Sequence, residues 1–570
     1  PASEQAADTD RGPAAGKERK PFGAGARIAT SSEHALAPRQ EAGLRAFVAD
    51  YNRRTAGSKA LAAEHRPHLA DPRVVSGFRP LLKEVTYPIA VKRSAGCRLW
   101  DVDDNAYVDI TCGFGSMYFG YAAPFINEAL AAQMQEGFEI GPQHPLAGDV
   151  AALVAEFTGL ERVAFCNTGS EAVLGAMRLA RTVTGRGTVV LFDGDYHGIF
   201  DEVIVRGTPS GRSVPAAPGV MPEAVANVLV LEYGSDEALR VLRERAGELA
   251  AVMVEPVQSR RPDLQPREFL QACRDICTES GAAFIMDEVI TGFRVHPRGA
   301  QAVFDVRADI ATYGKVIGGG MPIGVIAGAP RFMDALDGGA WQFGDASFPE
   351  VGVTYFAGTF VRHPLTLAAA HAALTYLKEQ GPRLQQDVNA RTDRLVAELN
   401  AICTARGAPL EAVNFGSLFK IRFTGEEAFG DLFFTWMRHR GVHVWDARPC
   451  FLTAAHSDAD TAEVAAAFRQ TIDDMQAAGL LSAASGETAS APSGGDSAPT
   501  TEAQKEIWAA CAVGEDASRA YNESVTLRLC GPLQLAALRS AVQQACRRHD
   551  ALRSTITPDG EHLRIAPSLS

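Results

Sequence analysis

Near its middle the chain reads Ala283-Phe284-Ile285-Met286-Asp287-Glu288-Val289, a short apolar run that ends in two acids. An uninterrupted apolar run of this length is typical of a strand buried on both faces of a sheet. Similar runs occur at residues 163–165, 188–192, 227–231 and 251–254, and the segments between them have helical period and length. This alternation predicts an α/β fold, with a mostly parallel central sheet in a large domain. From residue 365 a long helical stretch leads to a smaller α+β domain that ends near residue 475.

The residues that follow each predicted strand are the first candidates for a binding site, because ligands bind beyond the carboxyl ends of parallel strands. Asn167-Thr168-Gly169-Ser170-Glu171 follows the first run, where a helix begins. Free backbone N–H groups at a helix start favour an anion, although a plain Thr or Ser helix cap has the same pattern. Asp193-Gly194-Asp195-Tyr196-His197-Gly198 follows the second run, where Tyr196 either stacks on a flat ligand or belongs to an ordinary turn.

Asp287 and Lys315 are the two charged residues that need an explanation. An acid at the end of a wholly apolar strand is costly to bury unless a cationic group pairs with it. Lys315 lies in the glycine-rich segment Tyr313-Gly314-Lys315-Val316-Ile317-Gly318-Gly319-Gly320. Because burial lowers the pKa of a lysine, Lys315 is a candidate amine nucleophile. It is not a P-loop lysine, since Val316 follows it instead of Ser or Thr. Gly358-Thr359 precedes a further predicted helix and is a second candidate phosphate donor.

Together these features match the parts of a single cofactor. The helix start at Gly169 and Ser170 suits a phosphate, and Tyr196 suits a ring face. Asp287 suits a ring nitrogen, and Lys315 suits an aldehyde carbon. A Schiff-base lysine and an acid partner for the pyridinium are what pyridoxal 5'-phosphate requires of a protein. We therefore predict that cofactor, with Lys315, Asp287 and Tyr196 as catalytic residues and no metal.

Residues from about 75 to 475 resemble the class III aminotransferases of fold type I, especially their glutamate-1-semialdehyde aminomutase branch. Six segments carry the resemblance, in the family's order and spacing. They are Trp100-Asp101-Val102-Asp103, Asn167-Thr168-Gly169-Ser170-Glu171-Ala172, Asp195-Tyr196-His197-Gly198, Val254-Glu255-Pro256-Val257, Asp287-Glu288-Val289-Ile290-Thr291-Gly292-Phe293-Arg294 and Gly314-Lys315 with the glycines after it. The resemblance implies a fold type I PLP-dependent transferase with transaminase activity.

The resemblance also implies roles for individual positions. The cofactor-binding residues that it implies are Gly169, Ser170, Tyr196, His197, Glu255, Asp287, Val289, Lys315 and Thr359. Within this set, Lys315 forms the Schiff base and Asp287 holds the pyridinium proton. Tyr196 and Val289 sandwich the ring, while the Gly169 and Ser170 amides hold the phosphate. Thr359 reaches the phosphate from the neighbouring subunit, which implies a homodimer.

Three segments need separate comment. The family's usual Asp-Gly-Asn turn is Asp103-Asp104-Asn105 here, a turn variant. Gln258-Ser259-Arg260-Arg261 differs from the aminomutases and leaves the partner of the cofactor's ring hydroxyl open. In that branch a Ser-x-x-Arg segment binds a substrate carboxylate, and Ser76-Gly77-Phe78-Arg79 resembles it. We therefore predict that Arg79 binds the carboxylate of the amino donor, the alternative being a structural arginine near the domain interface.

Composition divides the rest of the chain. Residues 1–40 hold few large apolar side chains and predict a flexible linker, and residues 41–74 predict a linker helix and an N-terminal arm. The aminotransferase follows over 75–475. Its large domain spans about 120–360, and its small domain combines the N-terminal segment with about 361–475. Ser, Ala, Gly, Pro and Thr dominate residues 481–500, which predicts a flexible tether.

Residues 501–570 resemble the truncated start of a nonribosomal-peptide condensation domain, with Arg548-His549-Asp550-Ala551-Leu552-Arg553 matching its early arginine-histidine segment. The fragment stops before that domain's catalytic double-histidine motif, so we expect it to be inert. A transaminase joined by a tether to a condensation domain looks like the internal aminotransferase of a hybrid polyketide–peptide assembly line.

That context predicts an acyl carrier protein as partner. The substrate would be a 3-oxoacyl thioester, the product a 3-aminoacyl thioester, and the donor Glu or Gln. Two alternatives stay open: a PLP transaminase or aminomutase acting on a free semialdehyde or keto substrate, and a non-catalytic docking or scaffold domain.

The composition excludes several other classes. The 570 residues carry a formal net charge of −13, and no basic block offers a surface for nucleic acid or anionic lipid. The apolar runs are far shorter than the ~20 residues of a membrane span, and residues 1–20 lack the apolar segment of a signal peptide. Cys273 and Cys277 have no second pair to complete a zinc site. We expect no disulfide framework and a reducing, cytoplasmic location.

Overall fold

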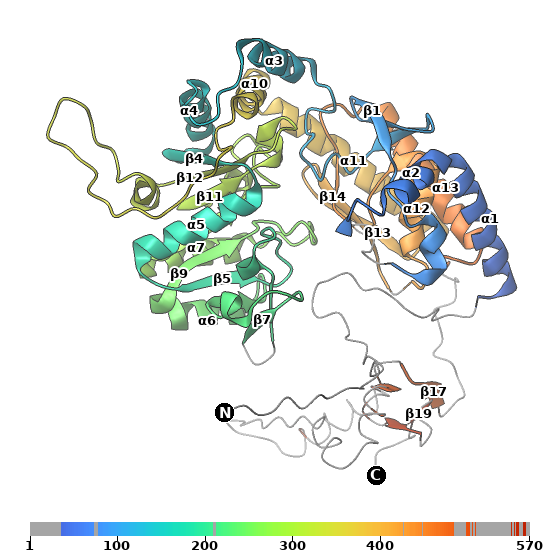
Figure 1. The fold of residues 1–570 in the computed structure, drawn as a ribbon. Coiled ribbons are helices and arrows are strands. Elements are labelled where there is room, and N and C mark those ends of the chain that lie inside the picture. The colour runs from blue at the N-terminus through green and yellow to red at the C-terminus, as the bar shows by residue number, and fades with distance from the viewer. Residues whose placement is uncertain are drawn as a thin grey trace, which may run out of the picture. The chain divides into compact units, whose positions relative to one another are not determined.

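The structure is a computed structural model of the chain. It describes residues 36–72, 78–208, 212–425, 427–446, 448–483, 497–501, 504, 505, 508, 538, 549, 552, 554–557 and 562–565. The chain divides into two compact units, residues 1–484 and 485–570. The first unit contains a large and a small domain, which lie side by side in Figure 1.

A seven-stranded sheet forms the centre of the large domain. In spatial order its strands are β4 (Arg162–Cys166), β12 (Gly324–Gly328), β11 (Ile310–Tyr313), β10 (Ala283–Asp287), β9 (Leu249–Val254), β5 (Thr188–Phe192) and β8 (Val228–Leu231). Only β12 runs antiparallel to its neighbours. All five strands expected from the sequence are present, and the mostly parallel sheet is confirmed.

Helices cover both faces of this sheet, which is why its strands are apolar throughout. Ala283 and Ile285 of β10 pack in one core with helix α5 (Gly169–Thr184). Phe284 and Met286 point to the opposite face, because successive side chains of a strand alternate. The helices of that second core are α4 (Leu146–Thr158), α6 (Asp236–Arg245), α7 (Arg267–Ser280) and α10 (Pro364–Gln380). Figure 1 shows α5 crossing the sheet in front of its strands.

The small domain joins segments from both ends of the first unit. Its four-stranded sheet contains β1 (Val91–Ala95), β2 (Arg98–Asp101), β3 (Ala106–Asp109) and β15 (Val442–His443). Its second sheet contains β13 (Leu410–Phe415), β14 (Leu418–Phe423) and β16 (Cys450–Phe451). The helices are α1 (Pro38–Arg54), α2 (Ala56–His65), α11 (Arg383–Arg406), α12 (Asp431–His439) and α13 (Asp458–Ala477). The parallel pairing of β3 with β15 ties the N-terminal segment to the rest of this domain.

The remaining elements of the first unit are short or peripheral. They are η2 (Pro80–Val85), α3 (Pro124–Glu136), η3 (Asp201–Val203), β6 (Val205–Gly207), β7 (Ser213–Pro215), η4 (Pro222–Val225), η5 (Ala246–Glu248), α8 (Ala300–Phe304), η6 (Lys315–Gly318), α9 (Pro330–Met333) and η7 (Asp334–Leu336). In the described part of the chain, no helix has the length and apolarity needed to cross a membrane.

The predicted linkers differ from the structure at their ends. Helix α1 begins at Pro38, inside the expected linker 1–40. It packs on the small domain, where the Phe47 ring stacks on the Trp436 ring at 3.6 Å. The expected tether 481–500 is too long at both ends. Leu481 is buried, because it packs into the core of the first unit. Strand β17 occupies Ser497–Pro499, because its backbone pairs with a later strand.

The second unit contains a three-stranded antiparallel sheet. Its strands are β17, β19 (His562–Ile565) and β18 (Ser554–Ile556), in that spatial order. Most of the segment 548–553, which carries the resemblance to a condensation domain, lies outside the described residues.

Candidate active site

A cavity of about 420 Å³ opens beside the carboxyl ends of β4, β5, β9 and β10. Its lining includes eight of the ten site residues predicted from the sequence, namely Gly169, Ser170, Tyr196, His197, Glu255, Asp287, Val289 and Lys315. Five different loops bring these residues together, as expected when the carboxyl ends of parallel strands meet at one edge of a sheet. This cavity is therefore the candidate active site.

The start of helix α5 forms one wall of the cavity. Thr168 caps the helix by accepting from the Glu171 amide at 3.2 Å, and the Glu171 carboxylate accepts in return from the Thr168 amide at 3.1 Å. Among the described residues, the amides of Gly169 and Ser170 have no hydrogen-bond partner. The helix cap and the anion-binding site are therefore both present, because the cap leaves these two N–H groups free for an anion.

Gly198 lies against this helix start and has to be glycine. Its φ is +114°, a conformation that side-chain-bearing residues rarely adopt. A Cβ atom at this position would lie 2.4 Å from Ser170 Oγ and 2.8 Å from Ser170 Cβ. The turn after β5 can therefore close on the start of α5 only without a side chain here.

Asp287 is held at the end of β10 by three hydrogen bonds. Its Oδ1 accepts from the Thr312 hydroxyl at 2.9 Å and from the Val289 amide at 3.1 Å. Its Oδ2 lies 2.8 Å from His197 Nδ1, and the other ring nitrogen of His197 lies 3.2 Å from Asp195. Burial alone would lower the pKa of His197, but the hydrogen bonds and charges of Asp195 and Asp287 outweigh burial and raise that pKa to about 10. His197 is therefore the cation that makes the buried acids tolerable.

Lys315 lies at the first position of η6, directly after β11 and Gly314. It is one of the few non-glycine residues with a positive φ, at +45°, and such a conformation in a bulky residue is strained. Burial lowers the pKa of the Lys315 amine to about 8, against the opposing effect of the negative charges on Asp287 and Glu255. The strained backbone fixes the amine at the cavity wall, and the lowered pKa makes it a better nucleophile near neutral pH.

Tyr196, Val289 and Glu255 complete the cavity wall. The Tyr196 side chain is 48 % exposed, so its ring is available to a ligand. Val289 lines the same cavity and packs close to Gly169, where a Cβ would lie 3.0 Å from it. Glu255 is buried and accepts from the Tyr196 amide at 2.9 Å. Burial and the nearby Asp195 charge raise the pKa of Glu255.

Two predicted site residues do not line this cavity. Thr359 is exposed on the segment between α9 and α10, and within one chain it lies outside the cavity wall. Arg79 donates to the carbonyl of Ala428, and its guanidinium lies 5.8 Å from the centre of the Phe429 ring. These contacts agree with the structural alternative for Arg79, and its binding of a donor carboxylate stays a prediction.

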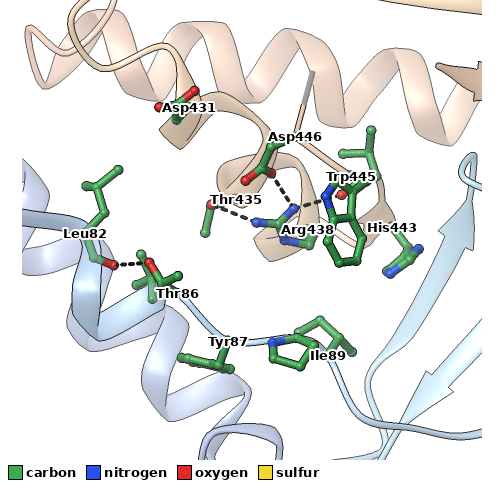
Figure 2. A pocket seen from close by; sticks show the side chains of 13 residues that line it. Leu82, Thr86, Tyr87, Ile89, Asp431, Thr435, Arg438, His443, Trp445 and Asp446 are labelled. Atoms are coloured by element: carbon green, nitrogen blue, oxygen red, sulfur yellow. Dashed lines mark hydrogen bonds and ion pairs between the residues drawn. The ribbon is translucent and has the colours of Figure 1, made fainter. Parts of the chain in front are cut away.

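A second cavity, of about 90 Å³, lies between η2 and α12. Arg79 is the residue that precedes η2. Figure 2 shows Arg438 in this cavity, donating to the Asp446 carboxylate at 2.8 Å and to the Thr435 hydroxyl at 2.9 Å. Its cation is therefore already paired. None of the residues predicted to hold the cofactor lines this cavity, which belongs to the packing of the N-terminal segment on the small domain.

The structure adds residues that sequence reasoning did not assign. Asp195 binds His197 and also accepts from Gln258 Nε2 at 2.6 Å. Thr312 reaches Asp287 from strand β11, which the sequence analysis does not predict. Asp195 belongs to the motif Asp195-Tyr196-His197-Gly198, so the sequence could have identified it as a site residue. Thr312 could not be identified from the sequence, because its position beside Asp287 depends on the pairing of β10 with β11.

The residues present fit pyridoxal 5'-phosphate. Two free amides at a helix N-terminus suit a phosphate, and the Asp287 carboxyl group suits a ring nitrogen. An amine with a lowered pKa, Lys315, suits an aldehyde. Tyr196 and Val289 offer apolar surface in the same cavity, and the glycine at position 198 leaves room at the helix start.

Comparison with known proteins gives the same assignment. Residues 82–470 match the family model "Aminotransferase class-III". A glutamate-1-semialdehyde 2,1-aminomutase of Chloroflexus aurantiacus is 34% identical over 421 residues, which are 70% of this chain and 91% of that protein. The corresponding aminomutase of Methanothermobacter thermautotrophicus is 33% identical over 396 residues, 66% of this chain and 90% of that one. Residues 495–565 match the family model of the condensation domain.

Solved structures agree. A β-phenylalanine aminotransferase from Variovorax paradoxus has a TM-score of 0.66 at 27% identity, covering 78% of this chain and 100% of that chain. A transaminase with PLP bound has a TM-score of 0.66 at 28% identity, over 75% of this chain and 98% of that one. The predicted fold type, cofactor and enzyme class are confirmed. The chain therefore belongs to the class III aminotransferases, the PLP-dependent transaminases of fold type I.

Proposed function

We propose that this enzyme transfers an amino group from an amino-acid donor to a 3-oxoacyl thioester held on an acyl carrier protein. The observation that carries the proposal is the pairing in one chain of a class III aminotransferase, residues 82–470, with a condensation-domain match over 495–565. A condensation domain acylates an amine on a carrier-bound chain, and a transaminase acting on the 3-oxo group supplies such an amine.

The cavity favours an acyl substrate over a small polar one. Ile290, Met321 and Ile323 line it together with Pro322, and the polar residues Asp287 and His197 line the same cavity. Apolar lining of this kind suits a hydrocarbon chain, while a few placed polar groups orient the reacting end. A free semialdehyde offers much less apolar surface to bury, so it gains less from these side chains.

In this proposal each polar residue has one task. Bound pyridoxal phosphate supplies the electron sink that acidifies the substrate's Cα–H. Lys315 attaches the cofactor and then moves the proton, because its amine has a lowered pKa and lies in the cavity. Asp287 holds the proton of the ring nitrogen, and His197 orients Asp287 through a 2.8 Å contact with its Oδ2. Gly169 and Ser170 bind the phosphate with their free amides, and Tyr196 and Val289 contact the ring faces.

We further propose a homodimer in which Thr359 reaches the partner's phosphate site. Figure 1 shows the segment between α9 and α10 extending from the large domain as a long loop. Phe343 is 93 % exposed and Tyr355 is 80 % exposed, and other large apolar side chains of this segment are exposed as well, namely Trp341, Phe348, Val353 and Phe360. Apolar exposure on this scale marks an interaction surface, and Thr359 lies in the same segment.

The test is a comparison of kcat/KM across substrates with either Glu or Gln as donor. The proposal expects the carrier-bound 3-oxoacyl thioester to react at least ~10-fold more efficiently than the free 3-oxo acid, because a positioned carrier adds binding energy. Preference for a free keto acid or for glutamate-1-semialdehyde would contradict it and support the free-substrate alternative. A protein that binds no cofactor would support the scaffold alternative.

A further inference from the structure

The segment Gln258-Ser259-Arg260-Arg261, which departs from the aminomutases, places a positive charge beside two others. Arg260 is exposed and lies three residues before Asp263, which is hydrogen-bonded to Arg422 of β14 at 2.9 Å. Lys420, also on β14, is half-buried. Arg448 is exposed and lies two residues before β16, which pairs with β14. After burial, the positive charges of Arg260 and of the neighbouring Arg422 lower the pKa of Lys420, and Arg448 adds to the effect. We call Arg260, Lys420 and Arg448 the basic triad.

Among the described residues, the basic triad differs from the neighbouring Arg422 in having no acidic partner. Arg422, two residues beyond Lys420, is neutralised by Asp263 at 2.9 and 3.0 Å and by Glu411 at 2.8 Å. Arg261 donates to Gln258 at 2.9 Å. No ion pair with a carboxylate is found for Arg260, Lys420 or Arg448 within the residues that the structure describes. Three neighbouring cations repel one another, and an anion bound between them relieves that repulsion.

The triad adjoins the active-site cavity without entering it. On one side, Arg260 follows Ser259, whose amide donates to Glu255 of the cavity at 3.3 Å. On the other side, Lys420 lies two residues after Leu418, on the same face of β14. Leu418 and Phe451 pack in an apolar cluster against Ile290, which lines the cavity. The triad is therefore separated from the reacting groups by one layer of apolar side chains.

The position of the triad outside the cavity favours one kind of anion over another, a phosphodiester over the carboxylate of an amino donor. The α-carboxylate of an amino donor is attached to the reacting carbon, so it must lie inside the cavity near Lys315. The arm of a carrier protein carries its phosphodiester at the end remote from the thioester. When the 3-oxo carbon lies at Lys315, that phosphodiester lies outside the cavity. Arginine and lysine are the side chains that bind phosphate oxygens best, through charge-assisted hydrogen bonds.

We propose that Arg260, Lys420 and Arg448 bind the phosphodiester of the phosphopantetheine arm that presents the 3-oxoacyl thioester. The proposal rests on the carrier-bound substrate proposed above and names the contact by which the enzyme distinguishes it from a free acid. In this arrangement Leu418, Phe451 and Ile290 contact the neutral part of the arm. The triad holds the phosphodiester and so determines how far the thioester extends into the cavity.

The experiment compares two small thioesters on the PLP-loaded enzyme: 3-oxoacyl-pantetheine, which lacks the phosphate, and 3-oxoacyl-phosphopantetheine. Wild-type enzyme should have a KM ~10-fold lower for the phosphorylated substrate, a difference of one charge-assisted contact. Lys420→Met keeps the length of the side chain and should remove most of this difference, as should Arg260→Ala and Arg448→Ala. Lys420→Arg should keep it, and the KM of the amino donor should not change.

Arg469→Ala is the matched control, since Arg469 is a partly exposed arginine on α13 with only a long ion pair of 3.8 Å to Glu398. It should leave both thioester KM values unchanged. Equal KM values for the two thioesters in wild-type enzyme would overturn the proposal. So would triad variants that raise both values equally, or that raise the donor KM, which would show a carboxylate site instead.

Titration calorimetry with phosphopantetheine and pantetheine measures the contact without turnover. Tighter binding of the phosphorylated compound, lost in Lys420→Met, supports the triad even if no thioester is transaminated, and that combination would overturn only the proposed function. Equal binding of the two compounds overturns the triad whatever the activity on carrier-bound chains.

Discussion

At the scale of single residues, Lys315 is the residue on which we propose that catalysis depends. We expect Lys315→Ala to lose at least ~100-fold in turnover, the usual cost of removing a general acid–base group, and more because the covalent attachment is lost as well. The variant should still bind cofactor through the Gly169 and Ser170 amides and the ring contacts. Borohydride should fix the cofactor on wild-type Lys315, identified by peptide mass spectrometry, but not on the variant. Turnover like that of wild type would contradict the assignment.

The lowered pKa of Lys315 predicts how cofactor loading depends on pH. Only the neutral amine attacks an aldehyde, and the pKa is about 8 in the folded protein. The rate at which cofactor-free protein takes up pyridoxal phosphate should therefore rise about tenfold per pH unit below pH 8 and level off above it. Absorbance of the bound cofactor measures the rate. Asp287→Asn removes a charge that raises this pKa, so its midpoint should move to lower pH. A midpoint near that of free lysine would contradict the account.

We expect the charge of Asp287, and not only its hydrogen bonds, to contribute to catalysis. Asp287→Asn keeps an acceptor but cannot stabilise a protonated ring, so transamination should fall ~100-fold while the cofactor still binds. Thr312→Val is the control, since it removes only the 2.9 Å hydroxyl contact with Asp287 and should cost less than tenfold. Single-turnover kinetics measures both. A loss below tenfold in Asp287→Asn would show that the charge is not needed.

At the scale of elements, we propose that the start of α5 and the turn after β5 form the phosphate site together. A Cβ at Gly198 would lie 2.4 Å from Ser170 Oγ, so Gly198→Ala should raise the Kd of pyridoxal phosphate at least ~10-fold, the cost of ~1.4 kcal/mol. Gly185→Ala is the matched control, because Gly185 also has a positive φ, +66°, but open space around its Cβ position. Both variants carry backbone strain, and only the first should weaken cofactor binding. Equal affinities would place the phosphate elsewhere.

Most strands of the central sheet can be predicted from the sequence, and some cannot. Strands β4, β5, β8, β9 and β10 are predictable, because each is a continuous apolar run followed by a turn. Strand β12 is missed, because Gly324 and Gly328 at its ends have the pattern of a turn and not of a strand. The residues around the cofactor are predictable from their positions after strands. The basic triad is not, since it depends on the pairing of β14 with β16 and on a loop from the other domain.

At the scale of the whole molecule, the exposed apolar side chains between α9 and α10 predict a dimer. Phe343→Glu combined with Phe348→Glu places two charges on this surface, which a buried interface does not tolerate. Sedimentation velocity should show wild-type dimers and largely monomeric variant, with cofactor more weakly held because Thr359 no longer reaches the partner's site. Val91→Glu, at another exposed apolar position on β1, should stay dimeric. A monomeric wild-type protein would contradict this prediction.

The two family matches in one chain bear on the kind of substrate that the enzyme uses. A class III aminotransferase alone is compatible with many free amino and keto substrates. The condensation-domain match over residues 495–565 is what directs the proposal to a carrier-bound chain. The apolar cavity wall and the basic triad are the features of the described residues that agree with it.

Transfer of labelled nitrogen from donor to carrier-bound chain is the measurement that tests this account most directly. PLP-loaded enzyme is incubated with nitrogen-labelled Glu or Gln and a 3-oxoacyl carrier protein, and the carrier is analysed by intact-protein and fragment mass spectrometry. The account predicts label at C3 of the acyl chain, with the donor converted to its 2-oxo acid and with Lys315→Ala inactive. An unlabelled carrier, with label found instead on a free keto acid offered in the same mixture, would contradict it.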